Sequence, residues 1–372
     1  MAACFIENRN ESQAAPRIAH VFPSFAVGGA QVRFAAIANH FGPAFRHIVV
    51  TLDGNLECRE RLRPDLDITF PAVGAARNAM LRNAFRFRRL LRDWAPDVLV
   101  TCNWGAIEFA LATLPPLTRH LHVVDGFGPE ERERQLPRRI WLRRLALRHS
   151  PVVLPSRTLV RIAAETWKLP QRMIRYVPNG VDLARFAAGA ARRDGATEPV
   201  IGTVAALRPE KNMARLLQAF ARLPAGRLLI VGNGPEHGAL HALAASLGVS
   251  ARVEFAGHHA DPAPFYLRFD IFALSSDTEQ MPLSVIEAMA SGLPVVSTDV
   301  GDVRLMLAEP NHAFVTPRDD AAFAAALAAL IDDPGLRRTL GAANRARAER
   351  EFDQAAMFAA HGALWRGTAG AA

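Results

Sequence analysis

Two runs of alternating strand and helix patterns constrain this chain more than any other feature. In the first run, short segments rich in Val, Ile and Leu alternate with helical segments from residue 17 to residue 157, separated by Gly or Pro breaks. The same alternation resumes at residue 200. This rhythm is typical of doubly wound parallel sheets, so the sequence predicts an α/β fold of two Rossmann-like domains facing a cleft.

The predicted strands share a buried apolar pattern. They lie within residues 17–25, 46–52, 97–103, 120–126 and 151–157 in the first run, and within residues 200–207, 227–235, 253–258, 271–276 and 294–299 in the second, and the segments 17–25 and 227–235 end in loops. Residues 28–42 are predicted to form a glycine loop and then a helix. Further helices are predicted over residues 78–94, 138–150, 212–223, 236–248 and 321–333, and in the stretch that follows residue 281. No sequence repeat of 20 to 50 residues is present, so the two runs repeat an architecture rather than a sequence.

Breaks in this rhythm predict the domain boundaries. Residues 1–15 are expected to be a disordered lead-in to an N-terminal domain over residues 16–186. The segment "AAGAARRDGATEP", residues 187–199, has no strand pattern and is predicted to be the linker. A C-terminal domain is predicted over residues 200–351, and a last helix at about 352–368 is expected to pack back on the N-terminal domain.

Composition narrows the partners and the compartment. The formal net charge of +8 favours polyanionic partners such as phosphates, nucleic acids or anionic lipids. Three cysteines without metal-ligand spacing fit a reducing compartment, and the polar start "MAACFIENRNESQAAPR" predicts no signal peptide. No apolar run is long enough to span a bilayer. We therefore expect a cytoplasmic protein, soluble or attached to a membrane surface.

Two acidic and two basic side chains follow predicted strands. In "SSDTEQMPLSVIEAMASG", Glu279 lies in the loop after the strand 271–276, and Glu287 lies about one and a half turns into the next helix. In "LRPEKN", Arg208 and Lys211 follow the first strand of the second run. Such sheets bind ligands at the carboxyl ends of strands, where two cations and free helix N–H groups form a diphosphate site. Taken singly, each segment also fits an ordinary turn or helix surface.

Further candidates at strand ends are glycines, which allow close backbone approach, and one aspartate. They are Gly28, Gly29, Asp125, Gly232, Gly234 and Gly301. The first glycine loop, "FAVGGAQ", does not contain G-x-G-x-x-G, so a standard dinucleotide fingerprint is absent. Paired glycines also make tight turns, and an aspartate before a glycine is common in turns, so these residues alone do not define a site.

Together, these segments resemble the GT-B glycosyltransferases of the large retaining group often called family 4. The resemblance covers the chain after residue 16 and is densest from residue 151 to residue 307. The E-x7-E of the family corresponds to Glu279 and Glu287, and its R-x-x-K corresponds to Arg208 and Lys211. "YVPNGVDLARF" is similar to the segment that ends the family's N-terminal domain, and "GGAQ" to its acceptor-side glycine loop.

The resemblance implies a metal-independent hexosyltransferase that moves a sugar from a nucleotide-diphosphate donor to a sugar or lipid-linked acceptor, in bacterial-type polysaccharide or glycolipid assembly. No cofactor is implied. Arg208 and Lys211 would hold the donor diphosphate and stabilise its charge as it leaves. Glu287 would bind the donor ribose and Glu279 would contact the donor sugar. Retaining members are described as front-face catalysts in which the leaving phosphate helps to deprotonate the acceptor, so no nucleophile is assigned.

The glycines have roles in the same resemblance. Gly28 and Gly29 would let the backbone of the N-terminal, acceptor-side domain approach the diphosphate and the acceptor. Three further glycines would lie along the donor in the C-terminal, nucleotide-sugar-binding domain, and these are Gly232, Gly234 and Gly301.

The chain departs from the family pattern at three positions. Asp302 stands where a second glycine is common and would add negative charge near the diphosphate. Gln31 stands where an acidic residue is common. Many relatives have a histidine after the strand 120–126, where the candidates here are His122 and Asp125, and Asp125 is preferred because it ends the strand. "DLD" at residues 65–67 matches the metal motif of another transferase fold by chance, so no metal is expected.

Two other classes of function remain open on sequence grounds. A nucleotide-sugar 2-epimerase on the same fold would convert the sugar nucleotide without an acceptor. A non-enzymatic protein that binds sugar or nucleic acid is the second alternative. A secreted sugar-binding protein would carry a signal peptide, and a nucleic-acid-binding protein would carry a recognition motif. Neither feature is found in the sequence, so no nucleic-acid partner is expected.

The predicted helix 78–94 carries arginines beside apolar residues. Leu81 and Phe85 lie between an apolar face and an arginine face. The apolar face holds Met80, Ala84, Phe87, Leu91 and Trp94, the opposite face holds Arg82, Arg86 and Arg89, and Arg88 and Arg92 lie beside the intermediate pair. This arrangement suits an anionic membrane surface, which predicts peripheral attachment to the inner face of the plasma membrane. It equally fits a core-facing helix with a solvated arginine face.

Overall fold

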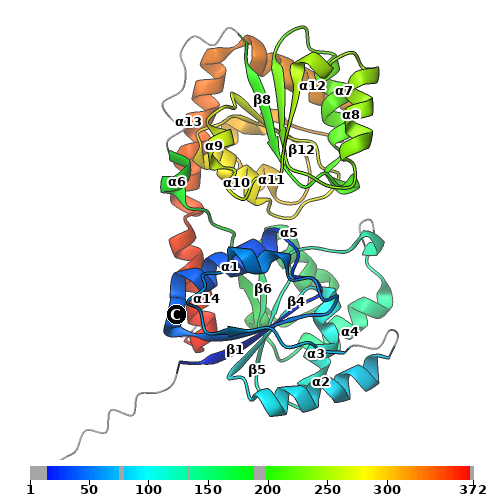
Figure 1. Cartoon of the computed structure of the whole chain (residues 1–372), viewed down its shortest axis with the longest axis vertical. Coiled ribbons are helices and arrows are strands. Elements are labelled where there is room, and N and C mark those ends of the chain that lie inside the picture. The colour runs from blue at the N-terminus through cyan, green and yellow to red at the C-terminus, as the bar shows by residue number, and fades with distance from the viewer. Residues whose placement is uncertain (1–14, 75–78, 132–133, 188–197, 369–372) are drawn as a thin grey trace, which may run out of the picture. The chain divides into compact units, whose positions relative to one another are not determined.

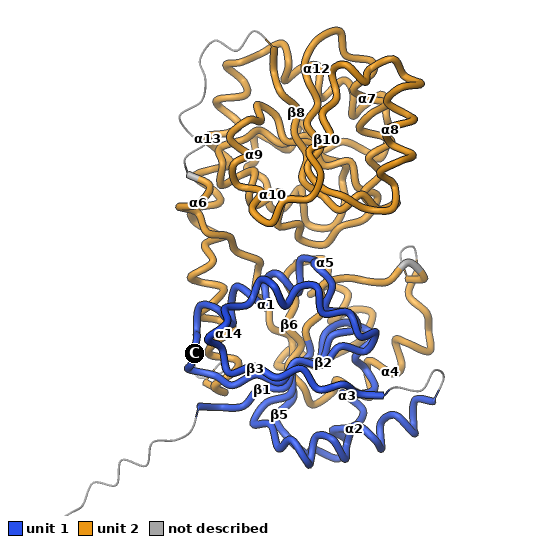
Figure 2. Tube along the Cα trace, viewed as in Figure 1, with its two compact units in different colours: residues 1–122 blue, residues 123–372 orange. Residues whose placement is uncertain are grey.

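The computed structural model describes residues 15–74, 79–131, 134–187 and 198–368. The chain divides into two compact units, Met1–His122 and Val123–Ala372, which Figure 2 colours blue and orange. Most of the predicted linker, residues 188–197, lies outside the described residues, as does nearly all of the predicted lead-in.

The first sheet has seven strands in the order β3-β2-β1-β4-β5-β6-β7. They are β1 (Arg17–Phe22), β2 (Arg46–Thr51), β3 (Ile68–Thr69), β4 (Val98–Cys102), β5 (Arg119–Val123), β6 (Val152–Leu154) and β7 (Ile174–Tyr176). Strand β1 pairs in parallel with β2 on one side and with β4 on the other. Neighbouring parallel strands need crossover connections, which the helices between them supply.

The second sheet has six strands in the order β10-β9-β8-β11-β12-β13, and every neighbouring pair is parallel. They are β8 (Val200–Val204), β9 (Arg227–Val231), β10 (Val253–Gly257), β11 (Ile271–Leu274), β12 (Val295–Thr298) and β13 (Val315–Thr316). The order reverses at β8, whose neighbours are β9 and β11. Such a reversal is where ligands bind in doubly wound sheets.

Helices connect and cover the strands (Figure 1). Their bounds are α1 (Gly29–Phe41), α2 (Met80–Trp94), α3 (Ile107–Ala112), α4 (Pro137–Leu147), α5 (Arg157–Arg161), α6 (Leu183–Ala187), α7 (Met213–Ala221), α8 (His237–Ser246), α9 (Ala263–Tyr266), α10 (Leu283–Ala290), α11 (Val303–Met306), α12 (Asp320–Asp332), α13 (Pro334–Glu351) and α14 (Gln354–Arg366). The start of α14 is tied to the chain before α6, because the Val181 N–H donates to the Phe352 carbonyl at 3.0 Å.

Both faces of the second sheet are buried, which explains its nearly continuous apolar strands. In β9, Leu228 and Ile230 join the core beneath α7, α8 and α12, whereas Leu229 and Val231 join the core beneath α9, α10, α11 and α13. Successive side chains of a strand point to opposite faces, so each strand supplies both cores. The predicted fold class, two Rossmann-like parallel sheets of the GT-B type, is confirmed.

Candidate active site

The carboxyl ends of two neighbouring strands of the second sheet bring Lys211 and Glu279 together. Lys211 follows β8 and Glu279 follows β11, and these strands pair directly. Lys211 Nζ donates to Glu279 Oε1 at 2.6 Å, and Ser276 Oγ donates to the same oxygen at 2.7 Å. The side chains keep 24% and 10% of their surface exposed, so the pair is accessible to a ligand.

Local sequence explains how Lys211 reaches this place. Pro209 opens one 3₁₀ turn, Pro209–Lys211, at the position where a missing N–H is tolerated. Asn212 then adopts a left-handed conformation with φ of 43°, which asparagine tolerates better than most residues. Its side-chain oxygen accepts the Arg215 N–H at 3.1 Å and so caps the start of α7. Arg208 precedes this turn and is exposed.

Glu287 lies on α10 and is bound by a tyrosine from a different helix. Tyr266, the last residue of α9, donates its hydroxyl to Glu287 Oε2 at 2.6 Å. The tyrosine ring is fully buried. Burial, together with the Glu287 carboxylate, raises the pKa of Tyr266 well above its usual value, so the hydroxyl stays protonated as a donor. The helix predicted after residue 281 is confirmed as α10, and Gly292 follows its end with φ of 67°.

The donor-side glycines are needed first by the loops themselves. A Cβ on Gly232 would lie 1.8 Å from the carbonyl oxygen of Ala205, and one on Gly234 would lie 2.5 Å from that of Leu207. These contacts pack the loop after β9 against the loop after β8. Gly301, with φ of 55°, passes equally close to the carbonyl oxygen of Glu279, where a Cβ would lie 2.5 Å away. The glycines therefore set the spacing of strand-end loops, and their contact with a donor stays a prediction.

Asp302 bonds the backbone at the start of α5, a partner that the sequence did not indicate. Its carboxylate is 3% exposed and accepts the backbone N–H groups of Arg157 and Thr158 at the start of α5, with the Thr158 bond at 2.9 Å. Its own N–H donates to the Gln280 carbonyl at 2.9 Å. The N–H groups at the start of α5 thus stabilise the negative charge of this carboxylate. The effect of this charge on a bound diphosphate stays a prediction.

The remaining candidates fall in two places. Asp125 lies half-buried in the loop after β5, whereas His122 is 1% exposed within the sheet and shares a 2.7 Å contact with Thr101. Because His122 is buried, it cannot contact a ligand, and Asp125 is the better candidate for contact with the donor sugar or the acceptor. Gly28 and Gly29 belong to the first unit, where Gly28 precedes α1 and accepts the Val32 N–H at 2.9 Å. Gln31 turns its amide to the Ser24 carbonyl at 2.8 Å.

Several residues that support the site were not singled out in the sequence. Tyr266 holds Glu287, and a cluster of Asn212, Arg215 and Asp277 joins the loops after β8 and β11. Asp277 stands two residues before Glu279, and Asn212 directly follows Lys211. This closeness in the sequence to the predicted site residues is the signal that could have identified them. Within the described parts of the chain, no group of three or more His, Cys, Asp and Glu side chains could hold a metal ion. Among those same residues, no helix is long and apolar enough to cross a membrane.

Comparisons with known families identify the architecture. The family model described as "Glycosyl transferases group 1" matches residues 190–347, and the model described as "Glycosyltransferase Family 4" matches residues 27–185. Together these matches span both Rossmann-like halves.

The chain belongs to the group 1 glycosyltransferases.

Among curated proteins, this group 1 chain is 36% identical over 183 residues to the lipopolysaccharide core biosynthesis glycosyltransferase LpsE of Rhizobium meliloti. That alignment covers 48% of the chain and 53% of LpsE, so the chain matches about half of this relative's length.

Solved structures share the fold along nearly the whole group 1 chain. Sucrose-phosphate synthase from Thermosynechococcus elongatus superposes with a TM-score of 0.78 at 22% identity, covering 96% of this chain and 100% of that one. Anabaena Alr3699/HepE, in complex with UDP and glucose, superposes with a TM-score of 0.78 at 18% identity, covering 94% and 99%. At these identities the likeness establishes the GT-B fold alone.

Proposed function

We propose that this protein is a retaining, metal-independent glycosyltransferase that uses a nucleotide-diphosphate sugar as donor. The observation that carries the proposal is the 2.6 Å contact between Lys211 and Glu279 at the ends of neighbouring strands. A cation and a carboxylate at this edge suit a ligand that carries a diphosphate beside a sugar. Membership of the group 1 family and the likeness to a structure named with UDP and glucose support the same donor class.

In this proposal the two cations act on the leaving diphosphate. Arg208 and Lys211 stabilise the negative charge that grows as the bond between the sugar and the phosphate breaks, without moving a proton. Glu279 fixes Lys211 before the donor arrives and contacts the donor sugar. Glu287, oriented by the hydroxyl of Tyr266, accepts hydrogen bonds from the ribose. Asp125 contacts the donor sugar or the acceptor.

We further propose that the acceptor is a sugar or a lipid-linked sugar in polysaccharide or glycolipid assembly, reached at the cytoplasmic face of a membrane. The support comes from α2. Phe87 and Leu91 bury one side of this helix in the core, yet Leu81 and Phe85 are each 76% exposed. Arg82, Arg86 and Arg89 are exposed on the same helix. Exposed apolar side chains next to arginines suit the interface of an anionic bilayer.

The test uses the purified protein and a panel of UDP-, GDP- and ADP-sugars without an acceptor. A retaining transferase hydrolyses its donor slowly and releases a free sugar that first has the anomeric configuration of the donor, which proton NMR detects before mutarotation. A 2-epimerase instead converts the sugar nucleotide into its epimer. Epimer formation, or a first-formed sugar of inverted configuration, would overturn the proposal.

A further inference from the structure

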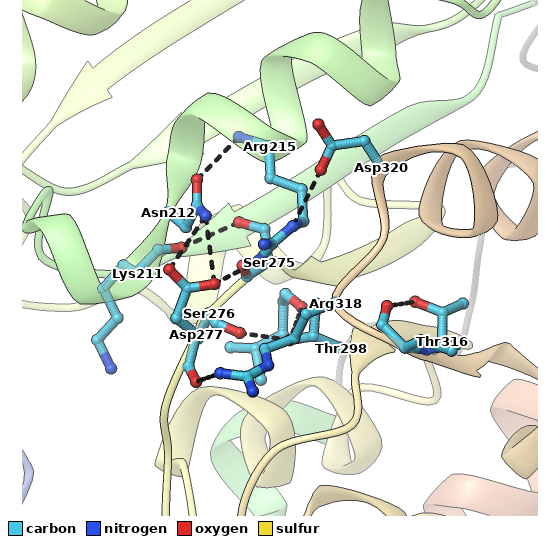
Figure 3. A network of polar contacts seen from close by, with 12 residues as sticks. Lys211, Asn212, Arg215, Ser275, Ser276, Asp277, Thr298, Thr316, Arg318 and Asp320 are labelled. Carbon is cyan, nitrogen blue, oxygen red and sulfur yellow. Dashed lines mark hydrogen bonds and ion pairs between the residues drawn. The ribbon is translucent and has the colours of Figure 1, made fainter. Parts of the chain in front are cut away.

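A buried arginine connects the two loops that carry Lys211 and Glu279. Arg215 is the third residue of α7 and is 8% exposed. Its Nη1 donates to the Ser275 carbonyl at 2.8 Å and to Asp277 Oδ1 at 2.7 Å, and its Nε donates to Asp320 Oδ1 at 3.2 Å. Figure 3 shows the guanidinium between the end of β11 and the start of α12.

Asp277 and Asn212 complete this connection. Asn212 Nδ2 donates to Asp277 Oδ2 at 3.1 Å, while Asn212 also caps α7 by accepting the Arg215 N–H. Two further hydrogen bonds between the same segments have main-chain carbonyls as acceptors. The Asp277 N–H donates to the Glu210 carbonyl at 2.9 Å, and Ser275 Oγ donates to the Lys211 carbonyl at 3.0 Å. The segment before α7 and the segment after β11 are therefore joined by three residue pairs in addition to the bonds of Arg215.

The main chain and the side chain of Lys211 contact different residues. The Lys211 carbonyl is held by Ser275, whereas its side chain turns away from the cluster (Figure 3) and ends at Glu279. Asp277 is two residues before Glu279, and Asn212 is adjacent to Lys211. A shift of the loop after β11 relative to the loop after β8 would therefore change the separation of Lys211 Nζ and Glu279 Oε1.

We infer that Arg215 is a positioning residue: its guanidinium, which bridges Ser275, Asp277 and Asp320, sets the distance between Lys211 and Glu279. A planar guanidinium with several fixed donors can hold these acceptors at once, and a lysine ammonium cannot reproduce that fork. Arg215 touches no ligand in this scheme and acts only through the two loops. The inference rests on the proposed function, since Lys211 and Glu279 are its donor-binding pair.

The test compares Arg215→Lys with Arg337→Lys. Arg337 bridges α12 and α13 through the carbonyls of Leu330 and Ile331 at 2.6 and 2.8 Å, at the end of α12 opposite Asp320. Arg215→Lys is expected to lower kcat at least about tenfold with a much smaller change in donor KM, because misplacement of reacting groups mainly affects turnover. Arg337→Lys should leave kcat unchanged at an equal folded fraction, measured by thermal unfolding.

A second variant and a structural measurement keep the inference testable apart from catalysis. Asp277→Asn keeps the shape of its side chain but loses its charge, and it should reproduce the loss of kcat seen in Arg215→Lys. Crystal structures of both variants should show a lengthened separation of Lys211 Nζ and Glu279 Oε1. An unchanged separation, or a loss of kcat no larger than that of Arg337→Lys, would overturn the positioning role. If the wild-type protein turns over no nucleotide sugar, the proposed function fails, and the measured separation alone decides the role of Arg215.

Discussion

Lys211 Nζ lies 2.6 Å from Oε1 of Glu279, although 68 positions separate the two residues in the chain. The contact exists because β8 and β11 are neighbours in the sheet while β9 and β10 lie on the other side of β8. The sheet order thus converts two distant loops into one group of charges.

Removing either member of the pair should impair catalysis more than folding. Lys211→Ala removes a charge that stabilises the leaving diphosphate and should lower kcat/KM roughly 10²- to 10³-fold. Glu279→Ala should mainly lower kcat. Because the Glu279 side chain is only 10% exposed, either change leaves a largely buried group without its partner and should lower the free energy of unfolding by about 1 to 3 kcal/mol. Steady-state kinetics and urea unfolding of both variants check this, and wild-type-like turnover in both would contradict the site.

The Tyr266 hydroxyl should matter for donor binding through Glu287. Tyr266→Phe keeps the buried ring and removes the donor that orients the carboxylate. We expect nucleotide-sugar affinity to fall about fivefold, equivalent to about 1 kcal/mol, by isothermal titration calorimetry. Tyr176→Phe is the matched control, because Tyr176 is the other of the chain's two tyrosines and its ring lies under the Arg157 guanidinium. Equal affinities of the two variants for the nucleotide sugar would contradict a role of the Tyr266 hydroxyl in donor binding.

The exposed side of α2 should determine membrane attachment. The double variant Leu81→Ser/Phe85→Ser removes two side chains that are each 76% exposed, so it should fold like the wild type. Its binding to vesicles that contain phosphatidylglycerol should fall at least about tenfold. The reason is that inserting two apolar side chains into the bilayer interface contributes more than about 1.4 kcal/mol to the binding free energy.

The control for α2 is Leu267→Ser, at a leucine that is 46% exposed on the other compact unit. This variant should bind vesicles like the wild type in a sedimentation assay. Binding that survives the double variant, or that is independent of phosphatidylglycerol, would contradict attachment through α2.

Acid should destabilise the protein through buried histidines of the first unit. Burial lowers the pKa of His47 from 6.5 to about 4 and that of His120 from 6.5 to about 3. Both are neutral in the folded state, so the unfolded chain binds their protons first as the pH falls. Above pH 7 these two histidines should not change the free energy of unfolding. Below pH 6.5 that free energy should decrease by up to about 1.4 kcal/mol per pH unit for each histidine.

The interval from pH 6.5 to 5.5 isolates this effect. Burial alone would raise the pKa of Glu131, but its bonds to Arg143 and Arg139 lower that pKa from 4.5, so Glu131 adds its own loss of stability mainly below about pH 5. Urea unfolding at pH 7.5, 6.0 and 5.5 measures the slope. A free energy of unfolding that stays level between pH 6.5 and 5.5 would show that these histidines do not titrate as their burial requires.

The sequence was sufficient for the class of fold and for the placement of the main charges at strand ends. Strands buried on both faces are nearly continuous apolar runs, so β8, β9, β11 and β12 could be located from composition alone. The strands β3, β7 and β13 were missed, because each has only two or three residues and sits at a sheet edge.

Pairings across the site could not be predicted in the same way. The bond between Tyr266 and Glu287 and the bridge from Arg215 to Asp277 depend on the order of strands in the sheet, which local patterns do not encode. The partners of Asp302 could not be predicted for the same reason, since the start of α5 is about 145 positions away in the chain.

Donor binding is the most direct test of the central claim, that Lys211, Glu279 and Glu287 form a site for a nucleotide-diphosphate sugar. The measurement is the thermal unfolding midpoint of the wild-type protein, Lys211→Ala and Glu287→Ala with UDP, GDP, ADP and their sugars. A ligand that binds only the folded state raises the midpoint. The account predicts a rise with one nucleotide family for the wild type and a much smaller rise for both variants. No rise with any nucleotide, or equal rises in all three proteins, would contradict it.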